Sequence, residues 1–173
     1  IWNAGKFLQI NEAIFEDSLD FQNIHFESNK WIIKEIDDLQ IQVENLTKKY
    51  LFHEVANKIY HFVWHTYCDW YIELIKKNFN DKKYSDEIRK TSGWSFIQIL
   101  KIIHPIMPYI SEKLWRSLVN SNSFLMSQIY QKENFGKNFN NSKKNINLLI
   151  ELITSIRNLR SELNIPYKKL IDL

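Results

Sequence analysis

Glycine, proline and cysteine are scarce in this chain of 173 residues, which holds 3 Gly, 3 Pro and 1 Cys. The three glycines stand isolated at positions 5, 93 and 136, so they cannot form the glycine-rich phosphate loop of a nucleotide-binding protein. A single cysteine cannot form an internal disulfide, which favours a reducing compartment. No apolar run approaches the roughly 18 residues that span a bilayer, and no signal peptide opens the chain. We therefore expect a soluble, cytoplasmic protein that does not enter a membrane.

Apolar residues recur every three or four positions, which predicts an all-α fold, an antiparallel helix bundle. The pattern predicts helices within residues 1–10, after residue 27, and over 52–79, 87–103, 108–120 and 146–164. The helix after residue 27 should bury one apolar stripe at spacings of four, three, four and three: Ile32, Ile36, Leu39, Val43 and Leu46. The helix over 87–103 should end before His104, because the ring of Pro105 disfavours helical geometry in the preceding residue. We expect one domain over 1–165 and a linker over 166–173. The chain opens within a helix, so we expect it to be part of a longer protein.

The sequence supports more specific predictions for two of the helices and one connection. The helix over 52–79 is apolar around most of its circumference, so we expect it to be the central helix of the bundle, with Trp64 and Trp70 packed in the core. Polar, Asn-rich sequence predicts a long connection over 121–144. The last helix should bury one apolar set: Leu149, Ile153, Ile156, Leu159 and Leu163.

The predicted central helix carries side chains that could bind a metal ion or could simply pack or lie on the surface. His61, His65 and Asp69 follow one another at intervals of four, and Cys68 is close by. However, the sequence contains no Glu-x-x-His pair, CxxC or HExxH motif. We therefore predict no metal site, and we expect Cys68 to be a structural cysteine whose apolar surroundings raise its thiol pKa.

The charges are distributed unevenly along the chain. Residues 1–70 carry 6 Lys and Arg against 11 Asp and Glu, whereas residues 71–173 carry 17 against 9. This asymmetry is compatible with a polyanionic partner on one side of the molecule, and equally with an ordinary solvated surface.

Several phrases of the sequence are more specific than its periodicity. FVWHTYCDWYIELIK resembles the long-helix segment of the valyl-tRNA synthetases, and further phrases agree in the same order: KWIIKEIDDL, YLFHEVANKIY, ILKIIHPIMPYISEKLW and IRNLRSELNIP. Isoleucyl relatives usually have an Asn-Trp-Tyr phrase at the position where this chain has Cys68-Asp69-Trp70-Tyr71. The resemblance covers nearly the whole chain, and its departures are mainly in the connections before residue 29 and after residue 121.

The resemblance implies the helical anticodon-binding domain of a class I aminoacyl-tRNA synthetase, with tRNA(Val) and the catalytic and C-terminal domains of the same chain as partners. The catalytic signatures HIGH and KMSKS do not occur in these residues, so no catalytic residue and no cofactor is expected here. ATP and Mg²⁺ would belong to the catalytic domain. The alternatives are an isoleucyl- or leucyl-type synthetase domain and, from another class, a helical protein-interaction or metal-binding bundle.

The resemblance also implies site residues, because IWNAGKF matches the phrase that presents a basic and an aromatic residue to the anticodon. Lys6 and Phe7 match that pair, and Asn3 lies one turn before Phe7, within reach of a base edge. The competing interpretation is that Phe7 packs in the core. Arg157 and Arg160 are expected to contact tRNA or a neighbouring domain, or to pair with carboxylates of this chain.

Overall fold

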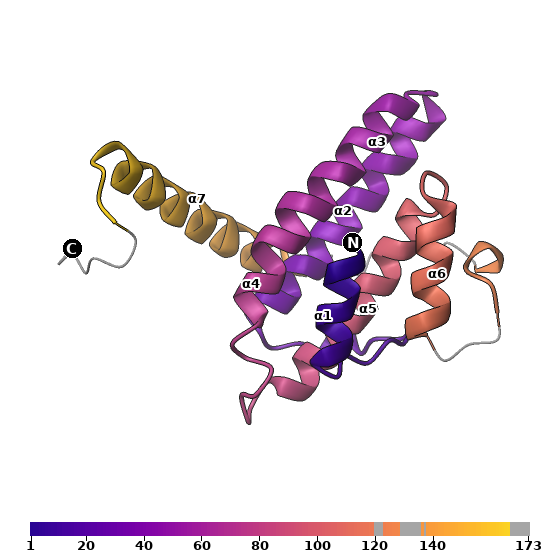
Figure 1. Ribbon diagram of the computed structural model, residues 1–173, viewed down its shortest axis with the longest axis horizontal. Helices are drawn as coiled ribbons and strands as arrows, with labels where there is room; N and C mark the ends of the chain where they lie inside the picture. The colour runs from indigo at the N-terminus through magenta and orange to yellow at the C-terminus, as the bar shows by residue number, and fades with distance from the viewer. Residues whose placement is uncertain (120–122, 129–135, 137, 167–173) are drawn as a thin grey trace.

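A computed structural model describes residues 1–119, 123–128, 136 and 138–166, and every regular element in these ranges is helical (Figure 1). The elements are α1 (Trp2–Ile10), α2 (Glu27–Lys48), α3 (Phe52–His61), the π-helix η2 (Phe62–Tyr71), α4 (Ile72–Ile75), α5 (Ser85–Ile103), α6 (Pro108–Leu118) and α7 (Asn140–Glu162). Short 3₁₀ turns cover Phe21–Asn23 and Leu125–Ser127. The all-α prediction is confirmed. Most of the predicted linker lies outside the described residues.

The long arm of the bundle is an antiparallel pair, in which α2 packs along α3 and η2 (Figure 1). The chain reverses between the two helices at Tyr50, which takes a left-handed conformation with φ of 58°. The predicted stripe of α2 faces the partner helix: Ile32, Ile36 and Leu39 are buried, and Val43 and Leu46 are partly buried. The stripe was therefore predicted correctly.

The central helix of the bundle is α5, and the expectation that residues 52–79 form it is wrong. Nearly every side chain of α5 from Thr91 to Ile103 is buried, including polar ones. Its small residues let the backbone of a neighbouring segment approach the helix closely. A Cβ on Gly93 would lie 1.9 Å from the carbonyl oxygen of Ile14, so only glycine fits at this position. A helix covered on all sides has no polar face, so its periodic signal is weak. As predicted, α5 ends at Ile103, two residues before Pro105.

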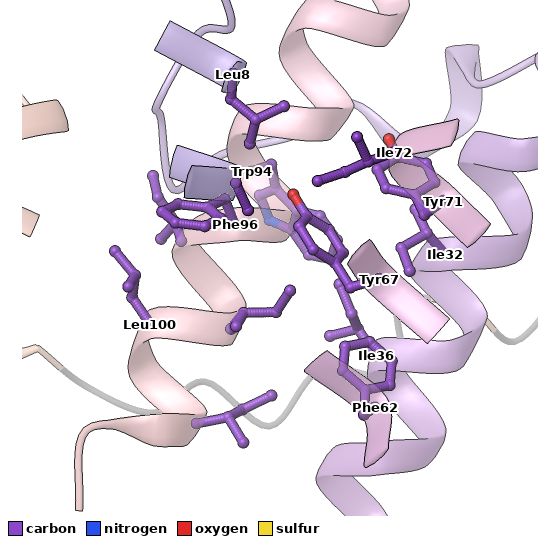
Figure 2. Packing of buried hydrophobic residues seen from close by; sticks show 14 of the residues in the cluster. Leu8, Ile32, Ile36, Phe62, Tyr67, Tyr71, Ile72, Trp94, Phe96 and Leu100 are labelled. Carbon is purple, nitrogen blue, oxygen red and sulfur yellow. The ribbon is translucent and has the colours of Figure 1, made fainter. Parts of the chain in front are cut away.

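The π-helix η2 changes which side chains of the long helix face the core. Its buried residues Phe62 and Tyr67 are five positions apart, as the i→i+5 bonding of a π-helix favours. The Tyr67 hydroxyl donates to the carbonyl oxygen of Ser92 at 3.3 Å, deep among the residues drawn in Figure 2. Trp64 is left 53% exposed on the outside, and Trp70 is only partly buried. The prediction that both tryptophans are core residues is therefore wrong for Trp64.

Helix α7 begins at Asn140, six residues earlier than predicted, because its first turns are docked on α2. Ile146 is buried there, and the ammonium of Lys143 lies 3.0 Å from Glu35 and 2.9 Å from Asp38. Beyond this contact α7 extends away from the bundle (Figure 1). The prediction that its apolar set is buried is consequently wrong: Ile153 and Ile156 are partly buried, and three are exposed, namely Leu149, Leu159 and Leu163.

Candidate nucleic-acid interface

Helix α1 holds the three predicted contact residues on its outer side. Its inner side packs on α5 and α6 through Ala4, Gly5 and Leu8. A Cβ on Gly5 would lie 3.0 Å from the ring of Phe96, so the glycine lets α1 approach α5 closely. Because one face of α1 is fixed in this way, Asn3 and Lys6 are presented to solvent.

Phe7 lies at the border between the core and the surface. Its ring meets the ring of Phe79 edge to face, with centroids 5.9 Å apart and planes at 72°. Phe79 is 2% exposed, whereas Phe7 is partly buried. The ring of Phe7 is thus held on one side by the core, and the residue as a whole keeps part of its surface exposed.

Lys6 carries an exposed ammonium group beside Phe7. Its Nζ donates to the side-chain oxygen of Gln9 at 2.9 Å and lies 5.6 Å from the centroid of the Trp2 ring. Within the described ranges no carboxylate pairs with it, so its charge is available to an anion. Asn3, one turn before Phe7, has an exposed side chain, and no protein group in the same ranges hydrogen-bonds to it.

The contact between Phe7 and Phe79 brings a second basic segment to the same end of the bundle. Phe79 belongs to the connection between α4 and α5, which lies close to the C-terminal end of α1 in Figure 1. This connection exposes four lysines: Lys76, Lys77, Lys82 and Lys83. Sequence reasoning missed them as interface residues, although two lysine pairs that flank a lone phenylalanine were a visible signal. Lys76 is paired with Glu73 at 2.6 Å, and the ammonium of Lys83 lies 4.8 Å from the centroid of the Tyr84 ring, so Lys77 and Lys82 are the more available cations.

Arg157 and Arg160 lie on α7, which packs on α2, and the structure does not bring them to α1. The guanidinium group of Arg157 lies 5.2 Å from the centroid of the Trp70 ring, a cation–π contact with η2. Arg160 donates to the carbonyl oxygen of Pro166 at 2.6 Å. Both arginines thus help to hold α7 or its end in place.

The His61, His65 and Asp69 series lies along the exposed side of the end of α3 and of η2. The two imidazole rings stack with centroids 5.5 Å apart, and His65 Nδ1 lies 3.3 Å from a carboxylate oxygen of Asp69. In the described part of the chain no three His, Cys, Asp or Glu side chains gather in a way that could hold a metal ion. Burial raises the pKa of the Cys68 thiol, as predicted from its apolar surroundings.

Comparison with known proteins supplies the family. The family described as "Anticodon-binding domain of tRNA ligase" matches residues 29–173. The valine–tRNA ligase of Staphylococcus aureus (strain JH9) is 31% identical over 177 residues, which include all of this chain and 20% of that protein. The valine–tRNA ligase of Staphylococcus haemolyticus (strain JCSC1435) is 32% identical over 180 residues, with the same coverage. The chain belongs to the anticodon-binding domain family of tRNA ligases.

This anticodon-binding domain spans about one fifth of the length of the curated relatives that it matches. The family match begins at Asn29, so α1 with Asn3, Lys6 and Phe7 lies before it. The similarity to the two valine–tRNA ligases does include α1, because it extends over the whole chain. None of the helices in the described ranges is long and apolar enough to cross a membrane.

Proposed function

We propose that this domain binds the anticodon loop of tRNA(Val) as part of a valine–tRNA ligase. The observation that carries the proposal is the pair formed by exposed Lys6 and half-buried Phe7 on α1, in a chain similar over its whole length to two valine–tRNA ligases. An unpaired base loop is recognised by an aromatic ring that stacks on a base and by cations that meet the phosphates. Helix α1 offers both groups side by side.

Each residue of α1 has a distinct proposed role. The open part of the Phe7 ring stacks on a splayed base, and the edge-to-face contact with Phe79 keeps that ring in one orientation. The ammonium of Lys6 meets a backbone phosphate, and the exposed amide of Asn3 hydrogen-bonds a base edge. Lys77 and Lys82 extend the positive charge beyond α1. Arg157 and Arg160, on α7, contact the tRNA or a neighbouring domain.

The domain itself performs no chemistry in this proposal. The catalytic domain of the longer chain carries out the ATP- and Mg²⁺-dependent aminoacylation, and this domain holds the tRNA so that its acceptor end reaches that site. Its partners are therefore tRNA(Val) and the catalytic and C-terminal domains of the same chain. It requires no cofactor of its own.

The test compares variants of the full-length ligase for binding to tRNA(Val), to tRNA(Ile) and to tRNA(Val) with an exchanged anticodon. Phe7→Ala should lose about 1–3 kcal/mol of binding free energy for the correct anticodon only, because it removes one stacked base. Lys6→Gln should weaken the binding of all three RNAs and reduce the slope of log K against log salt by about one phosphate contact. Lys49→Gln, the same change at an exposed lysine just after α2, is the matched control.

Far-UV circular dichroism must show that each variant is folded. If folded Phe7→Ala keeps wild-type discrimination between the two anticodons, the proposed contact is wrong. A parent enzyme that prefers tRNA(Ile) would instead overturn the assignment to valine.

A further inference from the structure

A groove lies between α6 and the 3₁₀ turn Leu125–Ser127, which are side by side at the edge of the bundle (Figure 1). Its volume is about 510 Å³. It lies on the side of α6 that faces away from the buried residues Ser111, Leu114 and Trp115. None of its lining residues in the described ranges belongs to α1, so the groove is separate from the contact residues of that helix.

The two walls of the groove are fixed to each other. The backbone amide of Leu125 donates to a carboxylate oxygen of Glu112 at 3.0 Å. The indole N–H of Trp115 donates to the carbonyl oxygen of Ser123 at 2.9 Å. The side chain of Leu125 is 3% exposed, so it anchors the turn in the core. The groove is therefore formed by the fold itself and needs no ligand to open it.

The groove carries more positive charge than Glu112 neutralises. Both oxygens of this carboxylate are already engaged, because one accepts from Leu125 and the other accepts from Nε of Arg116 at 3.1 Å. In the described ranges no acceptor binds the two terminal nitrogens of Arg116, and no carboxylate pairs with the exposed ammonium of Lys113. Both cationic groups can therefore bind an anion such as a phosphate.

Two aromatic side chains stand at the same groove. Tyr109 is 92% exposed, and no aromatic ring packs on it in the parts of the chain that the structure describes. Phe124 is 51% exposed, and the guanidinium group of Arg116 lies over its ring, 4.3 Å from the centroid. Exposed rings beside available cations are the combination that binds single-stranded nucleic acid, because rings stack on bases and cations meet phosphates.

We propose that this groove binds an unpaired nucleotide of the tRNA, as a second contact separate from the anticodon contact on α1. The inference rests on the proposed function, in which the domain binds tRNA. Arg116 and Lys113 meet the phosphate of that nucleotide, and its base stacks on the ring of Tyr109. An acidic protein segment would also pair with the two cations, but it would leave the open ring of Tyr109 without a planar partner. Because the contact does not read the anticodon, it strengthens the binding of a tRNA whatever its anticodon.

The first test measures how variants of the full-length ligase bind tRNA(Val) and tRNA(Val) with an exchanged anticodon. Tyr109→Ala should weaken the binding of both RNAs about ten-fold, because it removes one stacked base. Lys113→Gln should weaken both and reduce the slope of log K against log salt by about one phosphate contact. Phe52→Ala and Lys49→Gln change an exposed ring and an exposed lysine elsewhere, so these matched controls should bind both RNAs like the parent.

The two methionines of the chain provide a second measurement. Met126 lines the groove and is 75% exposed, whereas Met107 does not line it. Peroxide oxidation of each methionine in the full-length ligase is followed by peptide mass spectrometry, with and without tRNA(Val). A tRNA concentration that just saturates the parent should slow the oxidation of Met126 several-fold and leave that of Met107 unchanged. The double variant Tyr109→Ala with Lys113→Gln should lose this protection at the same concentration.

Parental affinity for both RNAs in folded Tyr109→Ala and Lys113→Gln would overturn the proposal, and so would oxidation of Met126 that tRNA does not slow. Losses confined to the correct anticodon would also overturn it, because the groove would then belong to the anticodon contact. If Met126 in the ligase without RNA already oxidises much more slowly than a free methionyl peptide, a protein segment covers the groove and the proposal is wrong. The proposed function is tested by the discrimination that Phe7→Ala retains, and this proposal by affinity for both RNAs, so each can fail while the other stands.

Discussion

Phe7 and Phe79 are 72 positions apart in the sequence, and their rings meet edge to face at a centroid distance of 5.9 Å. This contact joins α1 to the connection between α4 and α5, and it is the point where a candidate base-stacking ring is anchored in the core. Phe79 is thus a positioning residue in the proposed interface: it touches Phe7 and is itself 2% exposed.

Phe79→Leu should therefore loosen the Phe7 ring without exposing the core. We expect a loss of about 1 kcal/mol in the free energy of unfolding, from the lost aromatic pair and imperfect repacking. Discrimination between the correct and an exchanged anticodon should fall, although Phe7 is intact. The measurements are urea unfolding and tRNA binding in the full-length ligase, with Phe52→Leu, an exposed phenylalanine on α3, as the control. Unchanged discrimination would show that Phe7 needs no support from Phe79.

The buried ammonium of Lys101 makes a second prediction possible. Its side chain is 4% exposed and lies 2.6 Å from the carboxylate of Asp17, which also accepts from the amide of Gln98 at 2.9 Å. Asp17→Ala should lower the free energy of unfolding by about 3 kcal/mol, because it leaves a buried charge without a counterion. The double variant Asp17→Asn with Lys101→Met should recover part of this loss, since no charge remains buried. If urea unfolding gives Asp17→Ala the same free energy of unfolding as the parent, within experimental error, this account is contradicted.

The stabilisation that comes from the docking of α7 on α2 should weaken at acid pH. Burial by itself raises the pKa of Asp38, but the ammonium groups of Lys143 and Lys34 outweigh it and hold that pKa below its usual value of 3.8. The unfolded chain therefore binds the proton more readily, so the contribution is complete above about pH 4 and is lost as the pH falls through the folded pKa. Asp38→Asn should remove a contribution on the order of 1 kcal/mol at neutral pH and flatten this acid dependence.

The check is urea unfolding at about pH 3 and about pH 6, on either side of the usual carboxyl range. Glu44→Gln serves as the control, because Glu44 forms an ion pair with Lys48 on the exposed side of α2. An acid dependence that is the same in Asp38→Asn and the parent would assign the effect to other carboxylates.

Two tryptophans should respond in opposite ways to truncation. Trp94 on α5 is 1% exposed, so Trp94→Ala should leave a cavity and lower the free energy of unfolding by about 3–5 kcal/mol. Trp64 stands more than half exposed on η2, so Trp64→Ala in residues 1–173 should lower it by less than about 1 kcal/mol. Thermal or urea unfolding of the two variants measures the difference. Similar losses at both sites would mean that the ring of Trp64 is packed in solution.

The existence of the helices and much of the candidate site could be predicted from the sequence, because both depend on local spacing. The apolar interval of three and four predicted the stripe Ile32, Ile36 and Leu39, and Pro105 predicted the end of α5. The spacing that sets Asn3 one turn before Phe7 and the phrases shared with a family are also properties of the sequence alone. These features require only the geometry of one helix at a time.

The tertiary structure decided which neighbour covers each apolar face, and no local pattern contains that information. Trp64 and Tyr67 would share one side of an α-helix, but the π-helix η2 buries Tyr67 on Ser92 and leaves Trp64 outside. Helix α7 begins as early as Asn140 because Lys143 forms an ion pair with Glu35 on α2, about a hundred residues earlier in the chain. The contact of Phe79 with Phe7 likewise joins the connection that carries Lys77 and Lys82 to α1, across 72 positions of sequence. Such pairings are chosen by the packing of the whole bundle, whose free energy exceeds the small preferences of single segments.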